Sequence, residues 1–245
     1  MKFNIEEVFK VDDYMYFYSK FLTEERTKLE VENILSILNL QGNEKIIDIA
    51  CGFGRHAIEL SKMGFDVTGV DIMDEFLEIA KQKANNQKAN VNFLKKDIRK
   101  LEYKEEFDVA LLLFTSFGYF SEKENQLVLK NISNLLKRNG KFLFDIPNRD
   151  SRATKFSDSV FEVDKDMMID LPSFDPLSGY LNIRRIIIRE NKRREFEYNM
   201  RIYNLTEINK LLDEVGLTIK QVYGSWEKEK FTVNSPRIII LAEKI

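Results

Sequence analysis

The sequence predicts an α/β protein built around a doubly wound, mainly parallel sheet. From Ile46 onward, short apolar runs alternate with segments whose apolar residues recur at helical spacing. Val109–Phe114 is apolar throughout, as expected of a central parallel strand that is buried on both faces. Repeated strand–helix units of this kind are typical of sheets that carry helices on both faces.

Length and composition set the class of protein. A chain of 245 residues suits one domain with a full core. The 38 lysines and arginines nearly balance the 40 aspartates and glutamates, so no overall field favours nucleic acid. The single cysteine, Cys51, excludes an internal disulfide. With no expected secretory leader and no apolar run that could span a bilayer, we predict a cytoplasmic protein, a monomer or homodimer that does not bind membranes.

The main elements follow from local patterns. Residues 1–40 are expected to be helical, with Thr23 as an N-cap, and to form a lid. Ser121 and Glu124 form a capping box before a long helix that Gly140 is expected to end. The expected strands of the main sheet are Ile46–Ile49, Phe65–Asp71, Val91–Leu94, Val109–Phe114 and Lys141–Ile146.

Residues 151–205 break the strand–helix pattern. Leu181–Arg189 and Arg194–Tyr203 alternate as strands, with a turn expected at Asn191-Lys192. The segment is too short for an independent core, so we predict a β insertion after the fifth strand that forms a substrate lid on a single domain, 1–245. A helix capped by Thr206 and two strands, Leu217–Tyr223 and Arg237–Glu243, are expected to close the chain.

A glycine-rich loop follows the first strand. Gly52-Phe53-Gly54-Arg55-His56-Ala57 satisfies the dinucleotide pattern G-x-G-x-x-A. Asp48 lies at the end of the preceding strand, where it would repel the diphosphate that such a loop holds. A cofactor that carries positive charge, such as S-adenosylmethionine, is favoured by the same carboxylate. An NAD-dependent oxidoreductase remains the alternative.

Two further acids lie at strand ends, where ligands bind in open α/β sheets. Asp71 closes the second strand about twenty residues beyond the loop, where a carboxylate accepts hydrogen bonds from ribose hydroxyls. Asp97 follows the third strand and is a candidate acceptor for an adenine amino group, or a solvated loop residue. The acids and the loop therefore predict one cofactor site at this edge of the sheet.

These segments, with Thr115-Ser116-Phe117-Gly118-Tyr119-Phe120, resemble the class I S-adenosylmethionine-dependent methyltransferases. The likeness is greatest to a small-molecule-type subgroup with Cys-Gly-x-Gly-Arg-His and Ser-Phe-Gly-Tyr-Phe motifs, and it covers nearly the whole chain. It implies a Rossmann-like seven-stranded sheet with the last strand antiparallel. The general class motif has glycine where this chain has Ala50. The resemblance and the neighbouring positions give these expected cofactor contacts: Asp48, Ala50, Gly52, Gly54, Asp71, Ile72, Asp97, Ile98 and Phe114. One of the N-terminal tyrosines is a further expected contact; Tyr16 is chosen, with Tyr14 and Tyr18 left as alternatives.

The reaction expected is transfer of a methyl group to nitrogen or oxygen of a small molecule. His56, the only histidine, and Tyr119 are the candidate bases; each is alternatively a packing residue. Arg201 and Tyr203 are candidate substrate contacts, although a structural salt bridge explains Arg201 equally well. A cofactor-binding protein without catalysis is a further alternative. The chain has no Cys/His cluster for zinc, and glutamates interspersed among its only basic cluster argue against nucleic acid.

Overall fold

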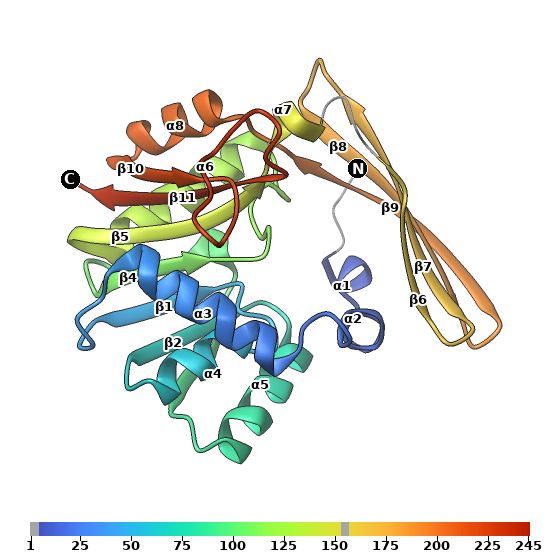
Figure 1. Ribbon diagram of the computed structural model, residues 1–245, viewed down its shortest axis with the longest axis horizontal. Helices are drawn as coiled ribbons and strands as arrows, with labels where there is room; N and C mark the ends of the chain where they lie inside the picture. The colour runs from blue at the N-terminus through green and yellow to red at the C-terminus, as the bar shows by residue number, and fades with distance from the viewer. Residues whose placement is uncertain (1–4, 153–156) are drawn as a thin grey trace.

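The main sheet has seven strands in the order β10-β11-β5-β4-β1-β2-β3, as Figure 1 shows. The computed structural model describes residues 5–152 and 157–245; residues 1–4 of the predicted lid and 153–156 of the predicted insertion lie outside this range. β3, β2, β1, β4 and β5 pair in parallel, and β11 is antiparallel to both neighbours. The strands are β1 Lys45–Ile49, β2 Asp66–Asp71, β3 Val91–Lys95, β4 Phe107–Leu112, β5 Leu136–Pro147, β10 Leu217–Tyr223 and β11 Arg237–Lys244. The predicted fold is therefore confirmed.

Helices cover both faces of this sheet because successive strand residues point to opposite sides. In β1, Ile46 packs with α3, α4 and α5, whereas Ile47 and Ile49 pack with α6 and α8. The helices are α3 Glu24–Leu38, α4 Arg55–Lys62, α5 Asp74–Asn86, α6 Glu122–Leu135 and α8 Leu205–Glu214, with the 3₁₀ turn η1 Ile98–Lys100 after β3. The strand order reverses between β1 and β4, which places a crevice beyond their carboxyl ends.

Two predicted boundaries differ from the structure. α6 ends at Leu135, and Gly140 lies inside β5 instead of ending the helix. The buried Leu136 already pairs with Phe107, and a bulge around Asn139, with φ of 62°, shifts the register before the rest of β5 pairs. The last helix is capped by Asn204, whose side chain accepts from the Glu207 N–H, and not by Thr206.

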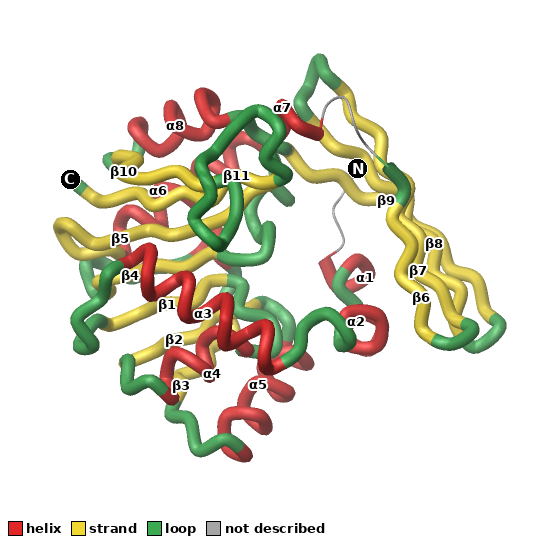
Figure 2. Tube along the Cα trace, in the orientation of Figure 1, coloured by secondary structure: helices red, strands yellow, loops and turns green. Residues whose placement is uncertain are grey.

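A second sheet of four antiparallel strands lies beside the main one (Figure 2). Its order is β6-β7-β8-β9, and α7 Arg149–Arg152 leads into it. Glu190 and Asn191 both have positive φ and form the turn between β8 and β9, one residue before the expected position. The strands are β6 Ser159–Val163, β7 Asp166–Asp175, β8 Tyr180–Arg189 and β9 Lys192–Arg201.

The short helices α1 Ile5–Val8 and α2 Val11–Tyr18 lie between the two sheets (Figure 1). Phe17 of α2 packs in an apolar cluster with Val163 and Ile187 of the second sheet. On the other side, Val11 packs against Phe53 and Phe76 of the main domain. By contrast, α3 packs on the main sheet itself. Among the described residues no helix is long and apolar enough to cross a membrane.

Candidate active site

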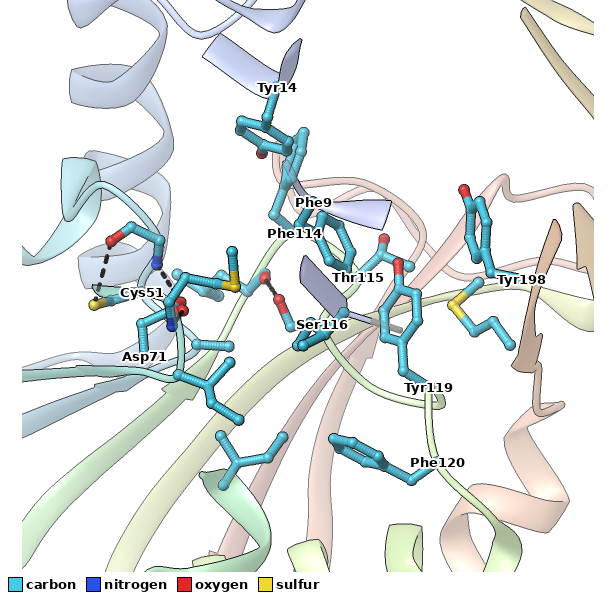
Figure 3. A pocket seen from close by; sticks show the side chains of 18 of the residues that line it. Phe9, Tyr14, Cys51, Asp71, Phe114, Thr115, Ser116, Tyr119, Phe120 and Tyr198 are labelled. Atoms are coloured by element: carbon cyan, nitrogen blue, oxygen red, sulfur yellow. Dashed lines mark hydrogen bonds between the residues drawn. The ribbon is translucent and has the colours of Figure 1, made fainter. Parts of the chain in front are cut away.

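A cavity of about 1020 Å³ lies beyond the carboxyl ends of β1, β2 and β4. The main domain forms its floor, and residues from α2, β7, β8 and β9 complete the wall. Figure 3 shows Asp71 and Cys51 at one end and Tyr119 and Tyr198 at the other. The residues expected from the sequence that line it are Asp48, Ala50, Gly52, His56, Asp71, Ile72, Asp97, Ile98, Phe114 and Tyr119.

The glycine loop after β1 turns through three residues of positive φ. Ala50 has φ of 54°, Gly52 54° and Gly54 74°. Gly54 does not line the cavity; a Cβ there would lie 2.7 Å from the Phe93 ring. Gly54 is therefore required for packing of the helix start, whereas Ala50 and Gly52 bring backbone to the cavity.

Asp71 holds this loop in place. One carboxylate oxygen accepts from the Gly52 N–H at 2.8 Å, and the other accepts from the Met73 N–H at 2.9 Å. The residue is 7% exposed, and burial raises the pKa of its carboxyl despite these hydrogen bonds. Asp71 therefore joins the end of β2 to the loop after β1 while still facing the cavity.

Asp48 differs from the other acids of the site because one of its carboxylate oxygens is buried without a partner among the described residues. It is 2% exposed, and its Oδ2 has no hydrogen-bond partner within the described part of the chain. Burial raises the pKa of Asp48 to about 7, the nearby Asp71 acting in the same direction and Arg55 against it. A buried carboxyl oxygen without a partner is costly unless a ligand supplies one. The side chain is suited to receive a cationic group.

Asp97 caps η1 and is bound by Arg99. Its carboxylate accepts from the Arg99 backbone N–H at 2.9 Å and from the Arg99 side chain at 2.7–3.2 Å. Although burial opposes it, this bonding lowers the pKa of Asp97. Arg99 also pairs with Glu124 at 2.7 Å. The carboxylate is ionised and oriented at the cavity rim.

The segment after β4 has two consecutive left-handed residues, Phe114 and Thr115, with φ of 60° and 62°. Asp145 of β5 supports them: it accepts from the Phe114 N–H at 2.6 Å and from the Thr115 hydroxyl at 3.3 Å. Arg237 pairs with the same carboxylate. Sequence analysis missed Asp145, although an acid inside the apolar end of the fifth strand was a visible signal.

The imidazole of His56 pairs with Glu30 and is not placed as a base for a ligand in the cavity. Its Nε2 lies 2.9 Å from Glu30 Oε2, and Arg55 and Arg26 pair with the same carboxylate. Burial, with the neighbouring Arg55, lowers the pKa of His56 to about 4. A neutral imidazole therefore links the start of α4 to α3, which agrees with the packing alternative.

Tyr119 faces the cavity, and its ring packs against another aromatic residue. Its ring centroid lies 5.5 Å from that of Phe9, in an edge-on arrangement. Burial raises the pKa of the Tyr119 phenol, so the hydroxyl stays protonated at neutral pH. It can donate a hydrogen bond but is a poor base.

Three more expected residues do not line the cavity. Tyr16 donates to the Val163 carbonyl at 3.3 Å, while Tyr14 and Tyr18 of the same helix line the cavity instead. Arg201 pairs with Glu207 at 2.9 Å and Glu122 at 3.3 Å. Tyr203 is 1% exposed, accepts from Asn125 at 3.1 Å and donates to Glu122 at 3.2 Å. Arg201 and Tyr203 connect the second sheet to α6 and α8, as the salt-bridge alternative expects.

Comparisons with known proteins agree with this arrangement. Residues 46–140 match the family described as "Methyltransferase domain". The chain is 27% identical over 244 residues to the Geobacillus sp. (strain WCH70) protein named "Putative methyltransferase GWCH70_2453", covering 95% of this chain and 99% of that one. It is 30% identical to human glycine N-methyltransferase over 134 residues, 48% of this chain and 45% of that one.

The fold also matches a solved structure. An S-adenosylmethionine-dependent methyltransferase from Clostridium acetobutylicum superposes with a TM-score of 0.79 at 22% identity, covering 98% of this chain and 99% of that one. Residues 46–140 thus match a methyltransferase domain, and the predicted enzyme, one that transfers methyl groups from S-adenosylmethionine, is confirmed.

Proposed function

We propose that the enzyme methylates the nitrogen of a small amine. One property of the cavity supports nitrogen over oxygen: the described residues that line it include no side chain suited to deprotonate a hydroxyl. The glycine N-methyltransferase relative also acts, by its name, on an amine.

The cofactor end of the cavity is assigned first. The unpartnered Oδ2 of Asp48 fits the ammonium group of S-adenosylmethionine, which no dinucleotide carries. Asp71 fits the ribose hydroxyls, because a carboxylate has about four acceptor sites and its bonds to backbone N–H groups leave acceptor capacity. Bound there, the cofactor supplies a methyl group already activated by the sulfonium charge.

Other expected cofactor contacts line the same end of the cavity as Asp48 and Asp71. Ile72 and Ile98 present apolar side chains beside Asp71 and Asp97, as an adenine ring requires. Asp97 accepts from the adenine amino group in this assignment. Phe114, held by Asp145, presents its backbone and ring beside the methyl group. Gly54 acts only through the shape of the loop.

No suitable base faces the acceptor within the described chain. His56 is neutral and bound to Glu30, and the Tyr119 phenol stays protonated. Most of the lining carboxylates are paired with an arginine or with backbone N–H groups. An amine that arrives neutral has its own lone pair and needs only alignment in a dry pocket, whereas a hydroxyl needs deprotonation.

The charges of the cavity wall do not favour an acidic acceptor. Every lining arginine is paired with a carboxylate: Arg55 with Glu30, Arg99 with Asp97, Arg185 with Asp170, and Arg237 with Asp145. The cavity wall carries five carboxylates, Asp48, Asp71, Asp97, Glu124 and Asp170, against the four guanidinium groups Arg55, Arg99, Arg185 and Arg237. The excess is one carboxylate, and with Asp48 assigned to the cofactor ammonium the wall leaves no net positive charge to attract an acidic acceptor.

The lid in this proposal is smaller than the sequence suggested. α2 and the second sheet contribute Tyr14, Tyr18, Asp170 and Tyr198 to the cavity wall. α3 belongs to the main core, so α1 and α2 are the described part of residues 1–40 that can act as a lid. We assign α1, α2 and β6–β9 to enclosing the acceptor and excluding water.

Methyl transfer to a panel of amines and matched alcohols tests the proposal. The purified full chain is incubated with S-adenosylmethionine and each compound, and S-adenosylhomocysteine and methylated product are measured by mass spectrometry. Methylation of amines with alcohols inert is the expected result. Methylation of alcohols alone would overturn the assignment to nitrogen, and stabilisation of the protein by NAD but not by S-adenosylmethionine would overturn the cofactor.

A further inference from the structure

The end of the cavity away from the glycine loop is built around Arg185 of β8. Arg185 is 5% exposed and lines the cavity. Its Nε donates to Asp170 Oδ1 at 2.6 Å and its Nη2 to Asp170 Oδ2 at 2.7 Å. This bidentate pair joins directly opposed residues of β7 and β8 and satisfies the arginine charge internally.

Two tyrosine hydroxyls are fixed by the same guanidinium group. Arg185 Nη2 lies 3.1 Å from the Tyr198 hydroxyl and 3.4 Å from the Tyr18 hydroxyl. Since a guanidinium group has no acceptor, both hydroxyl oxygens accept from Arg185 and their own protons remain available for donation. Burial keeps the pKa of both phenols raised, so they stay protonated. Tyr18 and Tyr198 therefore present O–H donors at the cavity wall.

Figure 3 shows Tyr198 and Tyr119 beside each other, across the cavity from Asp71. Phe9 and Tyr14 lie between these two ends in the same view. This half of the cavity thus combines hydroxyl donors and aromatic faces with an acid already paired to its arginine. Within the described residues it offers no unpaired cation for a carboxylate or a phosphate.

We infer that the acceptor carries its amine on a neutral, hydroxylated body, such as an amino sugar or an amino alcohol, and that amines bearing an acid group are excluded. The inference rests on the proposed transfer to nitrogen. Hydroxyl and ether oxygens accept from Tyr18 and Tyr198, and the aromatic rings cover the C–H faces of the body. A carboxylate at the same place would meet Asp170 without an unpaired positive charge in return.

Matched acceptors test this selectivity. Ethanolamine is compared with glycine, and glucosamine with its 6-carboxylate analogue glucosaminuronic acid. Methyl transfer gives kcat/KM for each, and calorimetry on the enzyme saturated with S-adenosylhomocysteine gives binding without turnover. At least one neutral member is expected to exceed its acidic partner by about tenfold or more in both measurements.

The outcomes separate the two claims. Equal or better binding and methylation of the acidic partners would overturn the inference but leave transfer to nitrogen intact. Failure of both neutral amines to bind would also overturn it. Methylation of hydroxyl oxygen in these compounds, shown by fragmentation of the product, would instead overturn the proposed function.

Two variants locate the effect in this cluster. Tyr198→Phe removes one donor and is expected to raise KM for the neutral amine about three- to tenfold with little change in kcat. Tyr103→Phe, remote from the cavity, is the matched control. Asp170→Asn leaves the Arg185 charge unbalanced, so the acidic-to-neutral preference is expected to rise about tenfold. If Asp170→Asn does not fold, Tyr198→Phe still decides, and an unchanged KM there would contradict the assignment.

Discussion

Asp71 at the end of β2 accepts a hydrogen bond from the backbone N–H of Gly52 in the loop after β1, at 2.8 Å. The carboxylate that we assign to the ribose thus also supports the loop that we assign to cofactor binding. Its second oxygen supports the Met73 N–H at 2.9 Å, at the start of α5. Binding and local structure depend on the same side chain.

Substitution Asp71→Ala is therefore expected to affect both. It removes the ribose acceptor and leaves two N–H groups without their partner. Affinity for S-adenosylmethionine is expected to fall roughly 10- to 100-fold, the loss typical of a hydrogen bond to a charged group. The melting temperature without ligand is expected to fall as well. Calorimetric titration and thermal unfolding measure the two effects.

Asp66→Asn is the control for this experiment, because Asp66 is exposed at the opposite end of β2. It is expected to leave affinity and melting temperature unchanged. An Asp71→Ala protein that binds S-adenosylmethionine as tightly as the unmodified chain would show that the ribose assignment is wrong.

Asp48 makes the stability of the free protein depend on pH. Burial raises its pKa from 3.8 to about 7, so the folded protein retains a proton that the unfolded chain has released. Stability from this group is complete below the unfolded pKa and is lost as the pH rises through about 7. Relative to Asp48→Asn, the unmodified protein is expected to lose melting temperature across this range.

Binding should follow the opposite course for the same residue. The ammonium group of the cofactor pairs with ionised Asp48, so affinity for S-adenosylmethionine is expected to rise as the pH approaches about 7. Above roughly 8 the affinity is expected to fall again, because the amino group of the cofactor loses its own proton. Asp48→Asn is expected to abolish the rise and to weaken binding. Titrations at several pH values check it; a rise below about 7 that survives in Asp48→Asn would assign that titration to another group.

Much of the site was predictable because its residues follow strands in sequence. Asp48, Asp71 and Asp97 each lie at or just beyond a strand end, and parallel strands bring those ends to one edge. Tyr16 was the wrong tyrosine for a reason visible in the sequence. Tyr14 and Tyr18 are four residues apart and share one face of α2, which places Tyr16 on another.

The acceptor end of the cavity was not predictable from local patterns. Arg185 and Asp170 meet only because β7 and β8 pair in one particular register. A shift of one residue would turn both side chains to the other face of that sheet. Likewise, the pairing of His56 with Glu30 depends on how α3 packs against α4. Tertiary packing therefore favours the packing alternative for His56 over the role of a general base.

His56→Gln tests whether the imidazole has a structural or a catalytic role. The structure places the imidazole as a neutral hydrogen-bond partner of Glu30, so kcat is expected to stay within about threefold of the unmodified enzyme while stability falls by about 1 kcal/mol. Turnover assays and thermal unfolding provide the two values. A loss of kcat of about a hundredfold or more at unchanged melting temperature would restore the catalytic role.

The pH dependence of stability gives an independent check on His56. Burial lowers its pKa from 6.5 to about 4, so the unfolded chain binds the proton first as the pH falls. Stability from this group is present above the unfolded pKa and decreases between 6.5 and about 4. His56→Gln is expected to remove that decrease. Because Asp48 acts in the opposite direction, the comparison is made in the Asp48→Asn background.

Ala50 provides the last prediction, because it occupies a backbone conformation that favours glycine. Its φ is 54°, and left-handed geometry costs a residue with a Cβ about 1–2 kcal/mol. Glycine relieves that strain but adds about 0.4–1 kcal/mol of entropy to the unfolded chain. Ala50→Gly is therefore expected to leave stability unchanged or slightly increased, and to leave cofactor affinity within about threefold.

The same exchange in regular helix should behave differently. Ala84 lies in α5 and is 4% exposed, so Ala84→Gly is expected to cost about 1 kcal/mol or more in thermal unfolding. If Ala50→Gly is as destabilising as Ala84→Gly, the Ala50 methyl group contributes packing against the core that outweighs its backbone strain. If it is neutral, alanine at this position is a tolerated departure from glycine, and the loop conformation depends on Asp71 and Gly52 instead.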